Sequence, residues 1–174
     1  ADFRAWSEKF GISPVVARVL RNRDLTEEAQ VEQFLRGTLQ DCHSPWLLKD
    51  MDRAVEEILE AVKTNLSIRV IGDYDVDGIC ASYILTTALQ LLGARTDTAI
   101  PHRIHDGYGL NDNLIREAQQ DGIGMIITCD NGISAAPQIA LANACGIRVI
   151  VTDHHEVPFE EIGSGGTGRR ELLP

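Results

Sequence analysis

The sequence lacks several features that would define a class of protein at once. No hydrophobic run approaches the roughly 20 residues that a bilayer-spanning helix needs, so we expect no membrane association, and no secretory leader is recognisable. There is no internal repeat. The cysteines, Cys42, Cys80, Cys129 and Cys145, are widely spaced and form no CxxC pair. This spacing indicates reduced thiols in a cytoplasmic protein.

The sequence is also poor in basic residues. Lys and Arg number 16 against 26 Asp and Glu, which gives a formal net charge of −10. Because nucleic-acid-binding surfaces neutralise phosphates with Lys and Arg, this deficit counts weakly against such a surface. An acidic protein can still cleave a phosphodiester if its acids hold metal ions. With 174 residues, 44% of them hydrophobic, the chain has room for one domain with a sizeable core.

The hydrophobic pattern changes along the chain. The first third has a helical pattern, in which Ser13 and Pro14 suit the N-cap and first position of a helix. From Ile68 onward, short β-rich runs alternate with helical stretches, which is typical of βαβ units. The expected strands are 68–73, 96–101, 124–130 and 147–155, and the expected helices between them are 78–93, 110–122 and 135–146.

The predicted fold class is therefore α/β, a doubly wound, mainly parallel sheet with helices on both faces, preceded by a short helical N-terminal segment. We expect residues 1–45 to form that segment and residues 46–162 to form the α/β domain. The Gly-rich residues 163–174 suit a linker or loop. Right-handed crossovers put the carboxyl end of every strand at the same edge of the sheet.

Acids and histidines lie at the carboxyl ends of three of the four expected strands. They are Asp73, Asp75 and Asp77 at the end of the first strand, Asp130 at the end of the third, and Asp153, His154 and His155 at the end of the fourth. Taken singly, each is more typical of a cap, a turn or a surface position. Together they meet at the edge where open α/β sheets bind ligands. Carboxylates ~6 Å apart repel by roughly 3 kcal/mol per pair at an effective dielectric of ~20, so the cluster predicts a bound cation.

Two other families of acid-rich site fit less well. A calcium-binding EF-hand loop needs a bidentate Glu at its twelfth position, where this sequence has Ile84, and the segment before Asp73 is a strand instead of a helix. A haloacid-dehalogenase-type phosphatase also carries acids after its first strand, one of them the nucleophile. The active site of such a phosphatase would not require a His-His pair.

Three motifs in order, "GDYDVDG", "TCDNG" and "TDHHE", resemble those of the DHH phosphoesterase family. Two further stretches, "PWLLKDMDRAV" and "IPHRIHDGYGL", are most similar to the members of that family that degrade single-stranded DNA. The resemblance extends from Ser44 to Pro158. It implies a site for one or two divalent ions, Mn²⁺ or Mg²⁺, that activate water to hydrolyse a phosphodiester.

The resemblance also implies roles for individual residues. Asp75, Asp77 and His154 correspond to metal ligands, Asp73 to a ligand or an acid beside the ligands, Asp130 to the acid that contacts or bridges both ions, and His155 to a ligand or a phosphate contact. Asp153 would fix the orientation of the imidazole. Arg103 suits a bidentate phosphate clamp, with His102, His105 and Tyr108 as further candidates for substrate binding; Tyr108 could stack on a base or simply pack.

The function that the resemblance implies is that of the N-terminal catalytic segment of a metal-dependent 5′-to-3′ single-stranded DNA exonuclease, a cytoplasmic enzyme of DNA repair and recombination. The alternatives are a DHH phosphoesterase acting on short oligonucleotides, cyclic dinucleotides or pyrophosphate, and a non-catalytic DHH scaffold. The family's fourth acidic motif and its second domain do not appear in this sequence. We therefore expect the remaining C-terminal domain of the same protein to be a partner of this segment.

Overall fold

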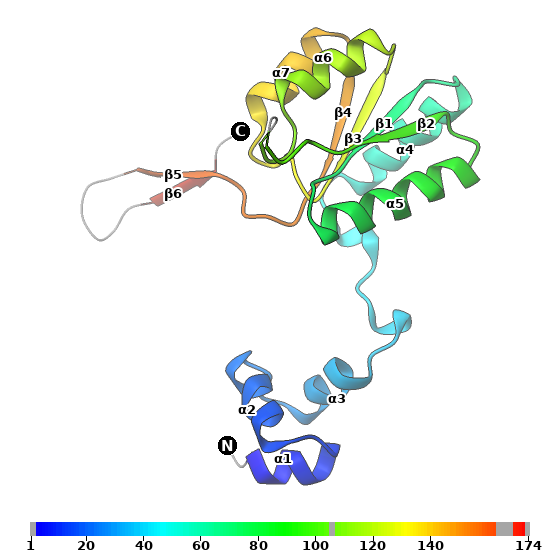
Figure 1. The fold of residues 1–174 in the computed structure, drawn as a ribbon. Helices are drawn as coiled ribbons and strands as arrows, with labels where there is room; N and C mark the ends of the chain where they lie inside the picture. The colour runs from blue at the N-terminus through cyan, green and yellow to red at the C-terminus, as the bar shows by residue number, and fades with distance from the viewer. Residues whose placement is uncertain (1–2, 105–106, 163–168, 173–174) are drawn as a thin grey trace. The chain divides into compact units, whose positions relative to one another are not determined.

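The computed structural model describes residues 3–104, 107–162 and 169–172 (Figure 1). The chain divides into two compact units, Ala1–Met51 and Asp52–Pro174. The division falls a few residues beyond the boundary expected at residue 45. Within the described residues, no helix is both long and apolar enough to cross a membrane.

The first unit is helical, as the sequence pattern predicts. It contains α1 (Phe3–Phe10), α2 (Pro14–Asn22) and α3 (Glu28–Arg36), followed by two single 3₁₀ turns, η1 (Leu39–Asp41) and η2 (Pro45–Leu47). Ser13 caps α2, because its side-chain oxygen accepts a hydrogen bond from the Val16 N–H at 3.2 Å. Phe10, Leu20 and Val31 form the buried core that the three helices share.

The second unit is an α/β domain built on a parallel sheet. Its elements are α4 (Met51–Lys63), β1 (Ile68–Ile71), α5 (Val76–Leu91), β2 (Thr96–Ala99), α6 (Asp112–Gln120), β3 (Met125–Cys129), α7 (Ala136–Ala144) and β4 (Arg148–Thr152). The four strands are all parallel and lie in the order β2-β1-β3-β4. The expected strands and fold class are thus confirmed.

Helices cover both faces of this sheet (Figure 1). Successive strand residues point to opposite faces, so Val70 and Ile127 pack in the cluster shared with α4 and α5, whereas Ile71 and Ile126 pack in the cluster shared with α6 and α7. β1 and β3 are buried along their whole length. This explains why their sequences are mostly apolar, apart from Arg69 and Thr128, and lack a regular alternation of apolar and polar residues.

The strand order reverses its direction between β1 and β3. The chain leaves β1 through α5 toward β2 at one edge, then crosses back through α6 to β3 on the other side of β1. The connections that follow β1 and β3 therefore run to opposite faces of the sheet. In open α/β sheets, such a switch point opens a crevice at the carboxyl ends of the two strands, where ligands bind.

A buried arginine ties the opposite end of the sheet together. Arg69, in β1, donates two hydrogen bonds to the Asp97 carboxylate at 2.9 and 2.7 Å and one to Asp121 at 2.9 Å. Asp97 is the register partner of Arg69 in β2, and Asp121 follows α6. The guanidinium thus fixes the β1–β2 pairing and holds the end of α6 against the sheet.

The C-terminal stretch differs in part from the expected linker. β6 (Arg169–Leu172) pairs antiparallel with β5 (Phe159–Ile162) in a two-stranded sheet. Residues 169–172 do not alternate apolar and polar side chains, and their strand forms through pairing with β5. Arg169–Leu172, in the stretch expected to be a linker or loop, thus form a strand, whereas residues 163–168 lie outside the described residues.

Candidate metal centre

The turn after β1 is shaped by glycines and by a helix cap. Asp75 is the N-cap of α5, and its Oδ1 accepts hydrogen bonds from the N–H groups of Asp77 at 2.8 Å and Gly78 at 3.0 Å. A Cβ at Gly78 would lie 2.5 Å from the backbone nitrogen of Asp73, so only glycine lets the first turn of α5 pack this closely. The local sequence therefore holds Asp73 beneath the start of α5.

Asp73 is buried without a partner. The residue is 1% exposed, and neither of its carboxylate oxygens has a hydrogen-bond partner among the described residues. Burying an unpaired carboxylate costs several kcal/mol, on the order of the penalties estimated for isolated charges in proteins. A cation beside Asp73 would remove most of this cost. The orphaned carboxylate, next to further acids and imidazoles, thus fits a divalent ion.

Asp130 occupies the matching position after β3. It is 8% exposed and adopts a left-handed backbone conformation with φ 62°. Its N–H donates to the Thr152 carbonyl at 3.0 Å, and its own carbonyl accepts from the Tyr108 hydroxyl at 2.9 Å. The next residue, Asn131, is buried and donates from Nδ2 to the carbonyls of Ile71 and Cys129, which ties the ends of β1 and β3 together.

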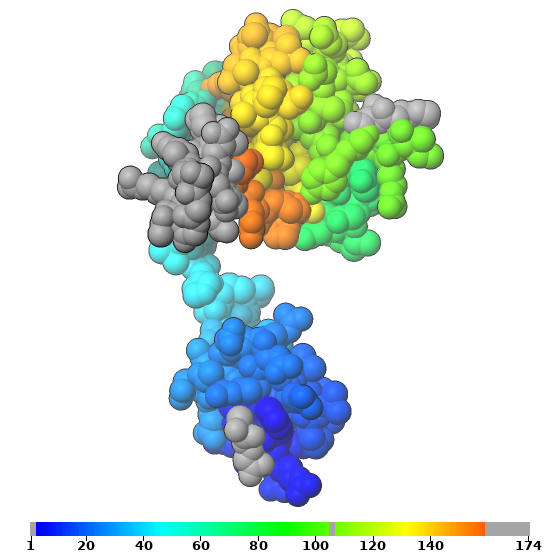
Figure 2. All heavy atoms as spheres, turned by 90° about the vertical axis from the view of Figure 1, so that its left-hand side faces the viewer, coloured from blue at the N-terminus to red at the C-terminus, as the bar shows by residue number. Residues whose placement is uncertain are grey.

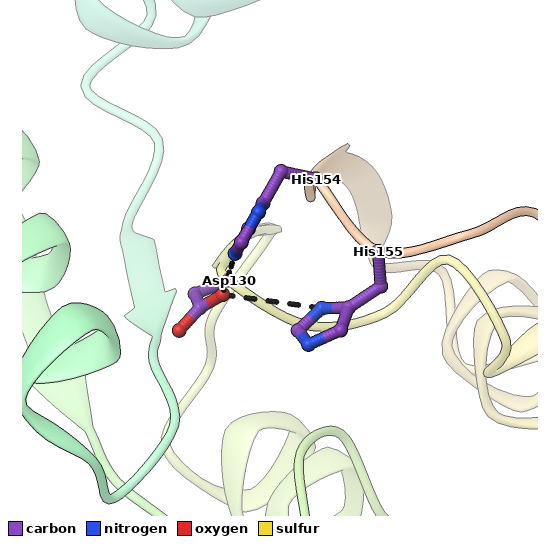
Figure 3. Close-up of side chains that lie close together, drawn as sticks. All are labelled: Asp130, His154 and His155. Atoms are coloured by element: carbon purple, nitrogen blue, oxygen red, sulfur yellow. Dashed lines mark hydrogen bonds and ion pairs between the residues drawn. The ribbon is translucent and has the colours of Figure 1, made fainter. Parts of the chain in front are cut away.

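The two histidines flank the Asp130 carboxylate (Figure 3). His154 Nε2 lies 2.8 Å from Asp130 Oδ1 and 3.7 Å from Asp77 Oδ2, and His155 Nδ1 lies 3.9 Å from the same Asp130 oxygen. Asp130, His154 and His155 each offer one ligand atom, and these atoms lie within 4.8 Å of one another. The space-filling view shows the chain after β4, in orange, at the surface of the second unit (Figure 2), and the side chains of His154 and His155 are 70% and 49% exposed. The cluster is therefore open to solvent on the histidine side.

The two histidines differ in their hydrogen-bond partners, because Asp153 contacts the ring of His155. Its carboxylate accepts from the Ile133 N–H at 3.0 Å, from the His155 N–H at 3.1 Å, and lies 2.7 Å from His155 Nδ1. Burial acts to raise the pKa of Asp153, but these hydrogen bonds outweigh it and lower the pKa below its ordinary value. The hydrogen bond to Asp153 in turn raises the pKa of His155. His155 thus has its Nδ1 held by Asp153, while His154 points its Nε2 at Asp130.

The candidate substrate contacts lie on the loop after β2. The Arg103 guanidinium stacks 5.2 Å above the Tyr74 ring, and Tyr74 meets Tyr108 edge-on with ring centroids 6.1 Å apart. His102 Nδ1 accepts from the Ile104 N–H at 3.3 Å. His105 lies outside the described residues. Arg103 and Tyr108 are thus linked through Tyr74, which follows β1.

Tyr108 contacts two residues of the metal cluster, Asp130 and His155. Besides its hydrogen bond to Asp130, its hydroxyl lies 3.4 Å from His155 Nε2. Burial raises the pKa of Tyr108 to about 12, and the negative charges of nearby acids, Asp73 first among them, act in the same direction. This phenol therefore stays protonated and able to donate.

The structure brings together part of the expected site. Asp130, His154 and His155 form the cluster, with Asp77 at its edge. Asp75 uses one oxygen to cap α5, and no ion pair or ligand group of the described residues includes Asp73. Sequence analysis missed Asn131 and Tyr74. Asn131 donates to the carbonyls of Ile71 and Cys129, and Tyr74 contacts the ring of Tyr108. Asn131 stands in "TCDNG" directly after Asp130, and this adjacency was the available signal.

Comparison with known proteins defines the class. The family model described as "DHH family, N-terminal domain" matches residues 67–164, and the chain belongs to this family. It is 35% identical over 153 residues to the single-stranded-DNA-specific exonuclease RecJ of Bacillus subtilis, covering 88% of this chain and 20% of the relative. It is 34% identical over 146 residues to RecJ of Escherichia coli, covering 83% of this chain and 24% of the relative.

Solved structures show the same likeness. The crystal structure of an exonuclease RecJ bound to manganese is 37% identical, with a TM-score of 0.59, and the match covers 63% of this chain and 28% of the other. RecJ of Thermus thermophilus in complex with Mn²⁺ is 27% identical, with a TM-score of 0.62 and coverage of 88% and 21%. The chain thus spans about a fifth to a quarter of the length of the curated relatives cited above.

Proposed function

We propose that the chain is the N-terminal catalytic segment of a metal-dependent exonuclease that degrades single-stranded DNA from its 5′ end. The observation that carries the proposal is the cluster of Asp130, His154 and His155 beside the orphaned carboxylate of Asp73, at the switch point of the sheet. The names of the relatives supply the substrate, single-stranded DNA. The same proposal makes the protein a cytoplasmic participant in DNA repair and recombination.

The donor set supports Mn²⁺ or Mg²⁺, as one or two ions. Carboxylate oxygen together with imidazole nitrogen suits Mn²⁺ better than Mg²⁺, which prefers oxygen alone, and two of the structures similar to this chain are described as Mn²⁺ complexes. The residues that would hold the ions are Asp73, Asp75, Asp77, Asp130 and His154. A divalent ion bound there supplies Lewis-acid activation of water and neutralises charge on the phosphodiester.

The protein's own groups divide the remaining work. His154 presents Nε2 to Asp130 and Asp77, which is the arrangement of a ligand. His155 is fixed through Nδ1 by Asp153, and its raised pKa favours the imidazolium form. We therefore assign His155 to the phosphate of the substrate, which a positively charged donor stabilises, and assign metal binding to His154.

The loop after β2 would hold the DNA backbone. Arg103 is the proposed phosphate clamp, because a guanidinium matches phosphate oxygens bidentately, and its stacking on Tyr74 limits the rotamers that it must lose on binding. His102 and His105 stay candidates for weaker contacts on the same loop. Base sequence should matter little, because these groups address the backbone.

The remainder of the polypeptide would complete the enzyme. This chain carries a net charge of −10, which opposes nucleic-acid binding outside the metal site. The matches to this chain cover only 20% and 24% of the length of the two relatives. We propose that the missing C-terminal part contributes the basic groove, a further metal ligand, and the gate that admits a single strand and excludes duplex.

The test uses the full-length protein with Mn²⁺ and a single strand labelled at either end. The proposal predicts progressive release of label from the 5′ end, sparing of a blunt duplex, and loss of the single-strand activity in Asp130→Asn. Asp52→Asn, which removes an exposed acid from α4, is the matched control and should behave as the parent. Release from the 3′ end, or rapid hydrolysis of a dinucleotide or pyrophosphate without DNA cleavage, would instead support another DHH phosphoesterase activity.

A further inference from the structure

Tyr108 stands where the strand ends meet. It lies on the loop after β2, its ring contacts Tyr74 after β1 at 6.1 Å and His155 after β4 at 6.0 Å, both edge-on, and its hydroxyl donates to the carbonyl of Asp130 after β3. One side chain therefore connects the ends of all four strands of the sheet.

The hydrogen bond to Asp130 acts on an unusual backbone. Asp130 has φ 62°, and an L-residue pays roughly 1–2 kcal/mol to adopt this left-handed conformation. The conformation persists only where surrounding contacts determine it. Three contacts do so here: the Asp130 N–H donates to Thr152, the neighbouring Asn131 is locked between β1 and β3, and the Asp130 carbonyl accepts from Tyr108.

The geometry separates two roles for this tyrosine. A side chain that stacks on a nucleobase needs a free ring face and does not need its hydroxyl. The Tyr108 hydroxyl instead makes a 2.9 Å hydrogen bond to the main chain of Asp130, a candidate ligand, and reaches within 3.4 Å of His155 Nε2. Both contacts end on the metal cluster.

We propose that Tyr108 is a positioning residue for the metal centre: its hydroxyl holds the Asp130 backbone so that the carboxylate meets His154. The inference rests on the proposed function, because it presupposes that this cluster binds a divalent ion. It assigns Tyr108 to metal affinity and removes it from base recognition. Substitutions of groups that orient metal ligands typically weaken metal binding by roughly 10–100-fold.

Phenylalanine separates the hydroxyl from the ring. Tyr108→Phe keeps both edge-on ring contacts and removes only the hydroxyl, with its hydrogen bond to Asp130 and its contact with His155. Tyr83→Phe is the matched control, because Tyr83 lies on α5, is 73% exposed and is not part of the cluster. Both variants lose one oxygen atom, so any difference between them reports the position of that atom.

The primary measurement is the Mn²⁺ dissociation constant of the 174-residue chain, by calorimetry or by Mn²⁺ electron paramagnetic resonance. We expect Tyr108→Phe to bind roughly tenfold more weakly than the parent, and Tyr83→Phe to bind within about twofold, with similar melting temperatures for both variants in EDTA. Equal affinities for Tyr108→Phe and the parent would overturn the positioning role alone. If neither the 174-residue parent chain nor the full-length protein binds Mn²⁺, the proposed metal site itself is overturned.

Kinetics of the full-length protein provide a second readout. A residue that sets the geometry of the metal ligands acts on the chemical step, so Tyr108→Phe should lower kcat and leave KM for single-stranded DNA unchanged. Adding Mn²⁺ well above the weakened dissociation constant should restore part of the lost rate. An increase in KM with kcat and Mn²⁺ affinity unchanged would place Tyr108 in DNA binding and refute the inference.

Discussion

Replacing Asp73 with asparagine should change protein stability in opposite directions without and with Mn²⁺. In the metal-free protein, Asp73 is a 1% exposed carboxylate with no hydrogen-bond partner for either oxygen among the described residues. Asparagine has nearly the same shape and no charge, so the substitution removes a buried unpaired charge. With metal bound, the same substitution removes a ligand or close neighbour of the ion.

The expected magnitudes follow from burial and from mass action. A buried unsatisfied polar group costs about 1–3 kcal/mol, and more when it is charged; because the asparagine amide also lacks partners, we expect Asp73→Asn to gain about 1–2 kcal/mol in EDTA. At about 2–4 °C per kcal/mol for a chain of this size, the melting temperature should rise by roughly 2–8 °C. Mn²⁺ at about 100 times its dissociation constant should stabilise the parent by roughly 2.7 kcal/mol, and the variant should gain little of this.

The assay is thermal unfolding of the parent and of Asp73→Asn, each in EDTA and in millimolar MnCl₂. Asp52→Asn, which removes an exposed acid from α4, controls for the loss of one negative charge. The reasoning predicts that the variant is the more stable protein in EDTA and the less stable one in Mn²⁺. A variant that is less stable than the parent in EDTA, or that keeps the full Mn²⁺ shift, would refute it.

Three further predictions test the site and its scaffold. In the full-length protein, Asp130→Ala should reduce turnover at least about a hundredfold while circular dichroism stays unchanged; a loss of less than about tenfold, or about 1.4 kcal/mol in barrier, would contradict its role as a ligand. Arg69→Leu removes three charge-assisted hydrogen bonds at the start of β1 and should destabilise the chain by about 2–4 kcal/mol in urea titrations; the Mn²⁺ affinity should not change, because the metal cluster lies at the other end of the strand. The hydrogen bond to Asp153 raises the pKa of His155, so its stabilising effect is complete below the ordinary histidine pKa of about 6.5 and is lost as pH rises through the folded-state value. The melting temperature in EDTA should therefore fall as pH rises above about 6.5, and this dependence should flatten in His155→Asn; an equally steep dependence in the variant would contradict the assignment.

The sequence by itself determined the elements and the edge at which they present their polar groups. The mostly apolar run of β3 (Met125–Cys129) and the helical periods on either side of it are local patterns, and they predict a parallel sheet because parallel strands need helical crossovers. Chirality of the crossovers then puts Asp73 and Asp130 at the same edge. The motifs that resemble the DHH family added the identity of the ligands, which no periodicity could supply.

Only the tertiary structure decided how these residues meet. The order β2-β1-β3-β4 makes β1 and β3 neighbours. As a result, Asn131 after β3 can donate a hydrogen bond to the Ile71 carbonyl in β1, and Asp73 after β1 is buried without a hydrogen-bond partner among the described residues. The hydrogen bonds from the Ile133 N–H to Asp153 and from the Tyr108 hydroxyl to the Asp130 carbonyl likewise join residues that are far apart in sequence, and Asp130 adopts a left-handed conformation that L-residues generally avoid. Such contacts form because packing and hydrogen bonding across the whole sheet offset backbone strain of about 1–2 kcal/mol at individual residues. A short stretch of sequence cannot predict this balance, because it depends on contacts between distant segments.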